Sequence, residues 1–321
     1  MGTLDIILID GLSFAMPLFI IAIGGIYSEK SGVIMLSLEG LQGFGTFVGA
    51  AAVVIISHYL GPSASLIYIS MLAAMIGGAF FSMLHAVLCI YFRARQVISG
   101  VVVNILAVAL TTFLTSIINS MLTGARSNRF LIGVSPRFTV PGLSQIPLIG
   151  GLFMNMYPFV VIIVVIAIIT WYILYKTRYG LRLRACGENP HSLDAAGGNV
   201  SRIRFSAVMI CGALAGLGGM SFAYSVSATF SPAHYMGFGF LAIAALIFGN
   251  WSIMPTFAVC MFFGMTRSAG YQLIRYLGLP GIYSELFMIL PYVLTLLLLV
   301  FFSKHNHPPR AIGEFFDKGK R

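Results

Sequence analysis

Long apolar segments dominate the chain, and short polar stretches separate them. Most of these segments approach the roughly 20 residues that an α-helix needs to cross the hydrocarbon core of a bilayer. The pattern predicts nine spans, within a range of eight to ten, and the two short segments around Asn250 could instead be half-helices. The predicted spans are residues 11–27, 33–57, 63–90, 97–120, 156–176, 204–226, 237–250, 253–268 and 282–302.

Two of these segments share a glycine-punctuated pattern. GLQGFGTFVG at 40–49 and GFGFLAIAALIFG at 237–249 each follow a break in the apolar pattern. Interrupted segments at matching positions of two halves point to the central path of a transporter. The pattern therefore indicates a solute path near these two segments, although glycines are common throughout the chain.

One polar stretch differs from the rest of the chain: RLRACGENPHSLDAAGGNVSRIRF, at 182–205. Asn189 is a favoured N-cap, and Pro190 suits the first helical position. Gly197 and Gly198 can supply a left-handed C-terminus, so the stretch predicts a short helix over Pro190–Ala196. Such a helix needs a surface to lie on, because isolated helices of about 12–15 residues are already marginal in water.

This short helix offers a small, largely uncharged knob. Leu193, Ala195 and Ala196 form the knob, with Glu188 and Asp194 at its edges. Resting on lipid is the alternative, but the helix lacks the large apolar face or aromatic anchor that a lipid surface requires. Docking to a protein is therefore preferred. Flanking arginines should hold both ends near the cytoplasmic membrane face; they are Arg182, Arg184, Arg202 and Arg204.

Composition agrees with a membrane bundle. Hydrophobic residues make up 59% of the 321 residues and charged residues only 9%, whereas soluble domains contain roughly 25% charged residues. The predicted fold class is therefore an all-α polytopic membrane protein. The net charge of +10 is spread over short runs between apolar segments, so it does not form the single basic face that nucleic-acid binding requires.

The positions of lysine and arginine predict the orientation. They concentrate at 93–95, at 176–204 and at 304–321, which should face the cytoplasm. Nine spans then place the C-terminus inside and the N-terminus outside. The outer loop at 121–155 also carries arginines, which weakens the rule, although longer loops count for less. Its prolines and glycines predict turns and a short surface helix.

No motif for catalysis is present. The chain lacks the P-loop, H-E-x-x-H and G-x-S-x-G patterns. GALAGLGG at 212–219 lies inside an apolar segment, which favours close helix packing over a dinucleotide loop. Four distant cysteines suggest neither a metal site nor a disulfide framework, and the histidines near the C-terminus fit a solvated tail. The chain is therefore expected not to be an enzyme.

Few strongly polar side chains fall within the spans, where such groups are costly and often functional. Glu39 could line the solute path, or it could accept hydrogen bonds from free N–H groups of a broken helix around Gly40 and Gly43, which is slightly favoured. Glu29 is expected at the surface. For Asn104, an interhelical hydrogen bond and a contact to a polar solute are equally supported.

Four motifs occur in order: SEKSGVIMLSLEG, QVISGVVVNILA, GLRLRACGENPHSLDAAGGNV and GALAGLGG. With them, the chain from about residue 10 to about residue 300 resembles the permease subunits of ATP-binding cassette importers of the branched-chain amino acid and ribose superfamily. Within that group it is most similar to nucleoside permeases that work with a basic-membrane-protein-type binding lipoprotein. It resembles the second of the two unequal permeases that such systems use.

The resemblance implies the partners and the site. The partners would be a second, related permease in a heterodimer, cytoplasmic ATPases, an extracytoplasmic substrate-binding lipoprotein and a small-molecule solute. No cofactor is expected on this chain, because ATP would bind the partner ATPase. The resemblance makes the polar stretch a coupling helix and places SLEG and VVVN along the path. The coupling residues would be Glu188, Asn189, Pro190, Leu193, Asp194, Ala195, Ala196 and Gly197, and the path residues Ser37, Glu39, Gln42 and Asn104.

The preferred function is the permease subunit of an ATP-driven nucleoside importer. The same class carrying riboflavin or a simple sugar is the alternative, followed by a stand-alone, ion-coupled carrier with Glu39 as its coupling group. A purely structural membrane protein is disfavoured, because polar groups at membrane depth are costly without a use. Residues 1–303 would form the permease domain, with a coupling loop at 177–203, and residues 304–321 a cytoplasmic tail.

Overall fold

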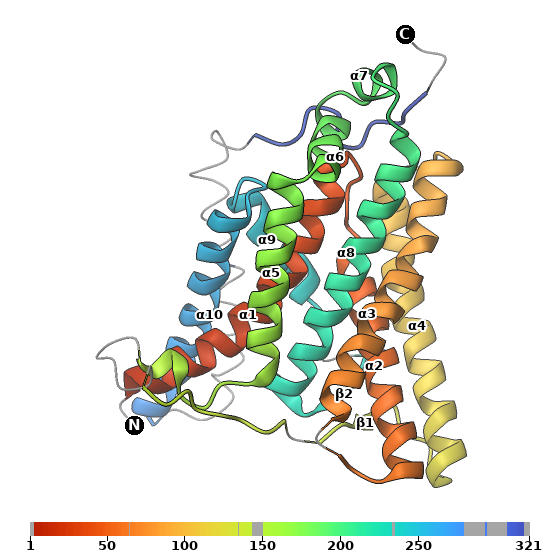
Figure 1. Cartoon of the computed structure of the whole chain (residues 1–321). Coiled ribbons are helices and arrows are strands. Elements are labelled where there is room, and N and C mark those ends of the chain that lie inside the picture. Colours follow the sequence, from red (N-terminus) through yellow and green to blue (C-terminus); the bar gives the residue numbers. More distant parts are fainter. Residues whose placement is uncertain are drawn as a thin grey trace.

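The computed structural model describes residues 3–63, 65–133, 135–142, 150–232, 235–278, 293 and 307–317, and they form a bundle of helices (Figure 1). The α-helices are α1 (Thr3–Lys30), α2 (Leu38–Leu60), α3 (Leu66–Ala86), α4 (Gln96–Thr123), α5 (Pro158–Lys176), α6 (Arg178–Glu188), α7 (Pro190–Ala195), α8 (Val200–Phe222), α9 (Phe238–Phe248) and α10 (Ile253–Tyr276). Single π-helical turns, Val87–Tyr91 and Ala223–Ser227, extend α3 and α8.

Six helices of the described residues are long and apolar enough to cross a membrane, and they match six of the predicted spans. They are α1 to α5 and α8. α9 has only 11 residues, so the half-helix alternative for that segment is correct. α10 begins at Ile253, as predicted, but continues to Tyr276. The predicted span at 282–302 lies outside the described residues, apart from residue 293.

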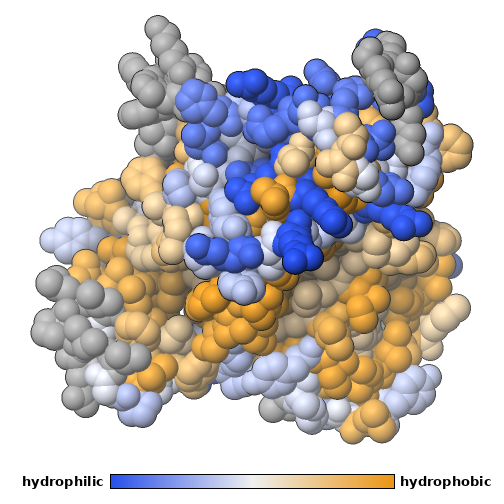
Figure 2. Space-filling model, turned by 45° about the horizontal axis from the view of Figure 1, so that its top comes forward, coloured by the Kyte–Doolittle hydropathy of each residue, from blue (hydrophilic) through white to orange (hydrophobic). Residues whose placement is uncertain are grey.

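The surface of the bundle has a hydrophilic end and apolar flanks, as a protein that crosses a bilayer requires. Figure 2 shows hydrophilic residues gathered over the end that carries α7, while apolar residues cover the flanks. Large side chains such as Ile76, Phe80 and Ile105 are more than 60% exposed on these flanks. Because lipid can cover an apolar belt that water cannot, the chain is a multi-pass membrane protein of the all-α class.

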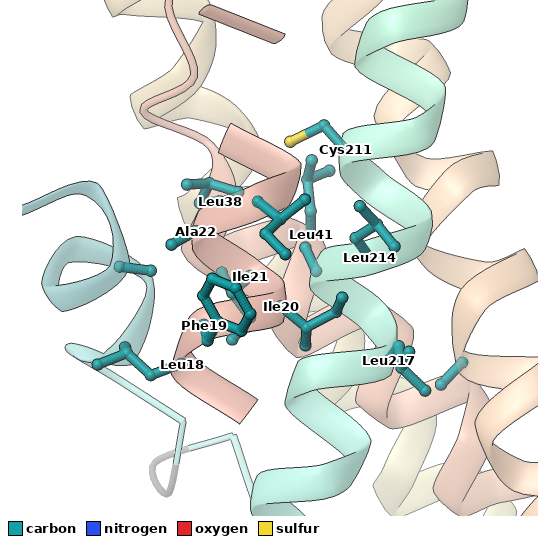
Figure 3. Close-up of a cluster of buried hydrophobic side chains, with 14 of the residues drawn as sticks. Leu18, Phe19, Ile20, Ile21, Ala22, Leu38, Leu41, Cys211, Leu214 and Leu217 are labelled. Atoms are coloured by element: carbon teal, nitrogen blue, oxygen red, sulfur yellow. The ribbon is translucent and has the colours of Figure 1, made fainter. Parts of the chain in front are cut away.

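The core lies where α1, α2 and α8 meet. Figure 3 shows Ile20 of α1 on the side of Leu214 and Leu217 of α8, with Leu38 and Leu41 of α2 above it, while Leu18 points away from α8. Leu18, Ile20 and Leu41 are fully buried. α8 packs against α1, α2 and α3 together, so it is the central helix among those described.

Glycines bring α3 and α8 into close contact. A Cβ added at Gly216 would overlap the carbonyl oxygen of Ala74, and one at Gly78 would overlap that of Gly212. One at Gly45 of α2 would lie 2.5 Å from the Cα of Gly216. The backbones of three helices therefore touch, which confirms that GALAGLGG serves close packing. Small residues have this role in membrane bundles because dispersion between touching helices replaces the hydrophobic effect.

A two-stranded ladder, which the sequence did not predict, closes the end of the bundle opposite α7 (Figure 1). β1 (Phe130–Leu131) pairs antiparallel with β2 (Thr229–Phe230), and Phe130 and Phe230 are opposite each other and almost fully buried. Ala228, just before β2, has the unusual φ of +52°. A 3-10 helix at Gly150–Phe153 is the short helix expected in this loop.

The other end of the bundle carries α6, α7 and residues 307–317, which Figure 1 shows as a dark blue trace beside them. The first residues of α1 lie at the opposite end. His307 is exposed, as the interpretation of a solvated tail requires, but Pro309 and Ala311 are buried, so part of residues 307–317 packs against the bundle. The arginine-rich segment that was expected to flank the short helix is itself largely helical, as α6.

Candidate coupling surface and solute path

Local capping explains why α6 and α7 form a bent pair. The Thr177 hydroxyl accepts a hydrogen bond from Gly180 N at 3.2 Å and begins α6. The Asn189 side chain accepts one from Ser192 N at 3.0 Å and begins α7, with Pro190 in its first turn. Gly197 then adopts a φ of +80°. The predicted caps are confirmed, and α7 ends at Ala195, one residue earlier than predicted.

α7 has an anchoring side and an exposed side. Pro190 and Leu193 are buried, so Leu193 holds the helix to the bundle and is not part of the predicted knob. Ala195 and Ala196 are exposed. Of the other coupling candidates, Glu188, Asn189 and Gly197 are exposed and Asp194 is half-buried. The exposed side is thus small and nearly uncharged.

A groove of about 380 Å³ runs between α6 and α7. Its walls combine apolar and polar side chains, and they include several of the predicted coupling residues. A helix or loop of a partner protein could seat in such a depression, because docking contacts need a concave and partly apolar surface. The lining residues are Leu181, Arg182, Ala185, Glu188, Asn189, Ser192, Leu193, Ala196 and Gly198.

Residues 307–317, here called the tail strap, tie this surface to the rest of the bundle. Ala311 N donates to Gly187 O at the α6–α7 junction (2.8 Å), and Gly313 N donates to Gly32 O between α1 and α2 (3.0 Å). The first residue of the strap contacts the turn that follows α9, where His307 N donates to the Asn250 side chain at 2.8 Å. The strap therefore connects elements that are far apart in the sequence.

Arg204 binds the tail strap from inside the bundle. Its guanidinium donates to Glu314 O at 2.8 Å and to Ser31 O at 3.2 Å. The residue is only 4% exposed, so the expectation that Arg204 flanks the coupling helix at the membrane face is wrong. A buried guanidinium must be paired, and backbone carbonyls of the strap and of the α1–α2 loop pair its Nη1 and Nε, while its Nη2 has no partner among the described residues.

Truncation from His307 onward should destabilise the end of the bundle that carries α6 and α7. It removes the Glu314 carbonyl from Arg204, and an unpaired buried polar group costs about 1–3 kcal/mol, more when it is charged. We expect a lower melting temperature of the detergent-solubilised complex and reduced recovery of bound ATPase. The matched control is Asp317→Asn, which keeps the strap and weakens its largely exposed ion pair with Arg93 at 3.5 Å; exposed ion pairs contribute little to stability, so this variant should change it little. A truncated protein as stable as the control would contradict this role.

The starts of α2 and α9 meet inside the bundle. Glu39 lies in the first turn of α2, and its carboxylate accepts a hydrogen bond from Gly237 N, the N-cap of α9, at 2.8 Å. A Cβ added at Gly239 would lie 2.5 Å from the Cα of Glu39. The two glycine-punctuated segments are therefore in contact, and Glu39 does accept from a broken helix, although at Gly237 rather than around Gly40.

Asn104 and Ser37 support the start of α2. Asn104 Oδ1 accepts from Gly40 N at 2.8 Å, and its Nδ2 donates to Leu36 O at 2.9 Å. The side chain thus bridges α4 and the α2 N-terminus, which favours the interhelical hydrogen bond over a solute contact. Ser37 is fully buried at the N-cap position of α2, where its hydroxyl lies 3.5 Å from Met35 Sδ. Both residues have structural contacts in this conformation.

Gln42, one turn further along α2, is fully buried. Its Nε2 donates to Tyr235 O at 3.3 Å, while its Oε1 has no partner among the described residues. The Tyr235 hydroxyl lies 3.3 Å from that of Thr111 on α4. Burial raises the pKa of Tyr235, so the phenol stays neutral. Gln42 is thus the path candidate with an unused acceptor.

Glu29 was expected at the surface, and the structure corrects this. The residue is 5% exposed, and its carboxylate accepts from Trp251 Nε1 at 2.6 Å. Trp251 and Asn250 both have positive φ values, +52° and +49°, in the turn between α9 and α10. Non-glycine residues adopt such values at a cost, and the bond to Glu29 together with the one from His307 holds this turn.

Substitutions at Glu39 distinguish a structural role, in which its carboxylate accepts a hydrogen bond from Gly237 N, from a role as the coupling group of an ion-coupled carrier. Glu39→Gln keeps an oxygen that can accept from Gly237 N, so uptake should stay within about twofold of wild type. Glu39→Leu removes the acceptor and should lower uptake and stability, since a buried unpaired N–H costs about 1–3 kcal/mol. Initial rates and melting temperatures check both variants. An inactive Glu39→Gln protein would instead support an ion-coupled carrier.

The described residues contain no group of three or more side chains suited to hold a metal ion. All four cysteines are buried and unlinked. Burial raises the pKa of the Cys186 thiol, which keeps it protonated and poorly nucleophilic.

Comparison with known proteins agrees with this description. A family model described as the permease component of the branched-chain amino acid transport system matches residues 7–299. The guanosine ABC transporter permease protein NupQ of Bacillus subtilis is 37% identical, over 99% of this chain and 98% of its own length. The nucleoside ABC transporter permease protein NupC of Lactococcus lactis is 35% identical, over 99% of both chains. A second Bacillus subtilis guanosine permease, NupP, is 27% identical over 76% of this chain and 68% of its own length. No solved structure matches.

Proposed function

The chain belongs to the family of permease components of the branched-chain amino acid transport system, and on this basis we propose that it moves nucleosides across the membrane in an ATP-driven importer. It is a transport subunit rather than an enzyme. The observation that carries the nucleoside assignment is similarity over nearly the whole chain to two permeases, one named for guanosine and one for nucleosides.

A second permease would complete the pathway. Bacillus subtilis has two guanosine permeases, NupQ and NupP, and this chain is more similar to NupQ. That pattern supports a heterodimer in which this chain pairs with a longer, related subunit. The class also supplies cytoplasmic ATPases, which hold the ATP, and an extracytoplasmic binding lipoprotein that delivers the solute.

The α6–α7 surface is suited to receive the motion of an ATPase. α7 presents Ala195 and Ala196 outward beside the groove, and Leu193 fixes it to the bundle. A rigidly mounted helix transmits a displacement to the spans, which can then rock between outward and inward access. The arginines of this end support a cytoplasmic location for α7 and the tail strap.

Uptake in proteoliposomes tests the proposal. The chain is reconstituted with its co-purifying permease and ATPases, and radiolabelled guanosine, adenosine, uridine, glucose and riboflavin are offered with the binding lipoprotein. We expect nucleoside uptake that requires ATP. Nucleoside uptake by this chain alone, without ATP, would overturn the importer in favour of a secondary carrier. ATP-dependent uptake of glucose or riboflavin without nucleosides would overturn the substrate class.

A further inference from the structure

An aromatic pocket lies at the junction of α2, α8, β2 and α9. Four rings and several small hydroxyl residues form its walls. The rings are almost fully buried, and the pocket has a volume of only about 20 Å³ in this conformation. That is space for about one water molecule, so a larger ligand could enter only if the rings moved apart. The lining residues are Thr46, Gly219, Phe222, Ala223, Val226, Ser227, Thr229, Phe230, Ser231, Tyr235 and Phe238.

The rings form two pairs, and each pair also packs against rings outside the pocket: Phe14 contacts Phe222 and Phe238, and Phe47 and Phe130 contact Phe230. Phe222 of α8 and Phe238 of α9 have centroids 4.5 Å apart. Phe230 of β2 and Tyr235 have centroids 6.1 Å apart and planes only 19° from parallel. Flat aromatic faces suit a flat, aromatic solute, because base–aromatic stacking contributes about 1–3 kcal/mol per base. A sugar without an aromatic ring would not use these faces in this way.

Gln42 adds a polar group beside this pocket. Its Cγ would lie 2.8 Å from a Cβ at Gly219, a residue of the pocket wall, and its Nε2 reaches the carbonyl of Tyr235, another wall residue. Its Oε1 is buried without a partner in the described part of the chain. Such an acceptor is unusual, because most buried polar side-chain atoms find a partner. A ligand with an N–H group would satisfy it.

We propose that this pocket with Gln42 is the nucleobase site of the chain, in which the rings stack on the base and the Gln42 carboxamide hydrogen-bonds its polar edge. A carboxamide presents a donor and an acceptor side by side, a pattern that pairs with base edges. The inference rests on the proposed nucleoside transport and deepens it by naming the residues that contact the base.

The surrounding backbone is compatible with a site that opens and closes. The π-helical turn Ala223–Ser227 and the positive φ of Ala228 stand between the α8 and β2 sides of the pocket. Both features are frequent at functional sites and are costly elsewhere. One ring pair lies on α8 and α9, and the other consists of Phe230 on β2 and Tyr235 before α9. A rearrangement of the π-helical turn would therefore move the two pairs apart and admit a base.

Gln42→Met tests the site in the complete complex. The variant keeps the length of the side chain and removes the acceptor that has no partner among the described residues, but it also removes the 3.3 Å hydrogen bond from Gln42 Nε2 to Tyr235 O. Replacing an unsatisfied group by an apolar one stabilises and losing the hydrogen bond destabilises, so the melting temperature should change little. The KM for guanosine uptake should nevertheless rise about tenfold, the factor that corresponds to about 1.4 kcal/mol of binding free energy. Competition by free guanine and by ribose distinguishes base recognition from sugar recognition, and guanine should lose potency in the variant.

Gln96→Met is the matched control. Gln96 is also a buried glutamine, but its Oε1 accepts from Ile34 N at 2.7 Å, so this variant should lose stability and keep the wild-type KM. A Gln42→Met complex with the wild-type KM and the wild-type ranking of competitors would overturn the nucleobase site while leaving nucleoside import intact. Absence of nucleoside uptake by the wild-type complex would overturn both.

Discussion

Replacing Ala195 or Ala196 by glutamate should abolish ATP-driven uptake without changing the amount of permease in the membrane. Both side chains are exposed on α7, so the isolated chain tolerates a charge there. Docking of the ATPase would bury that charge, and a buried charge without a partner costs several kcal/mol. Uptake into vesicles measures transport, co-purification of the ATPase measures docking, and immunodetection in membranes measures the amount of permease.

Ala125→Glu is the matched control for the α7 variants. Ala125 is also exposed, but it follows α4 at the end of the bundle opposite α7 (Figure 1). The control should transport normally and recover the ATPase in the wild-type amount. An Ala195→Glu or Ala196→Glu protein that does the same would exclude α7 as the surface that receives the ATPase stroke.

Gly216→Val should prevent the bundle from forming. Even the first added carbon would overlap the carbonyl oxygen of Ala74, which belongs to the backbone of α3 and cannot rotate away. Relief requires α3 and α8 to separate along their length. Overpacking of a tight core commonly costs about 1–3 kcal/mol and occasionally more, and a backbone clash at the centre of the bundle belongs to the severe cases. Loss of monodisperse protein after detergent extraction is the expected measurement.

Ala213→Val on the same helix provides the comparison. Ala213 is half-buried, so its additional methyl groups can move against neighbouring side chains rather than against a backbone. This variant should be extracted in the wild-type amount with a melting temperature close to that of the wild-type chain. Equal recovery of Gly216→Val would show that α3 and α8 do not require the close approach described above.

Local signals made much of the fold predictable from the sequence. Apolar length alone located six spans, and the short length of segment 237–250 correctly allowed a half-helix. Asn189, Pro190 and Gly197 defined α7 because caps act within a single turn. The packing role of GALAGLGG was also predictable, since small residues inside an apolar helix have few other uses.

Long-range contacts explain what the sequence did not reveal. Glu29 stands next to Lys30 and a short polar connection, so nothing local indicates that Trp251 encloses it. Arg204 lies in an arginine-rich segment, and its burial depends on Ser31 and Glu314, each more than 100 residues away. Strands of two residues likewise leave no periodic pattern, which is why the β1–β2 ladder was not predicted.

The predicted path residues show the same contrast between what local sequence signals indicate and what long-range contacts determine. Their polar character inside apolar spans selected Glu39 and Asn104, and the resemblance to a family added Ser37 and Gln42, but the sequence could not distinguish their individual roles. The hydrogen bonds assign Asn104 and Glu39 to holding helix starts. Within the described part of the chain, Gln42 differs from the other three because its Oε1 is buried without a partner, and such a property depends on long-range packing.

The tail strap also places the completion of the coupling end late in biosynthesis. Residues 307–317 leave the ribosome after every helix described here, yet Gly32, Gly187 and Arg204 are hydrogen-bonded to them. Chains whose synthesis stops before the strap would contain α1 to α10 and still lack those bonds. The end of the bundle that carries α6 and α7 therefore has all of its hydrogen bonds only once the strap has been synthesised.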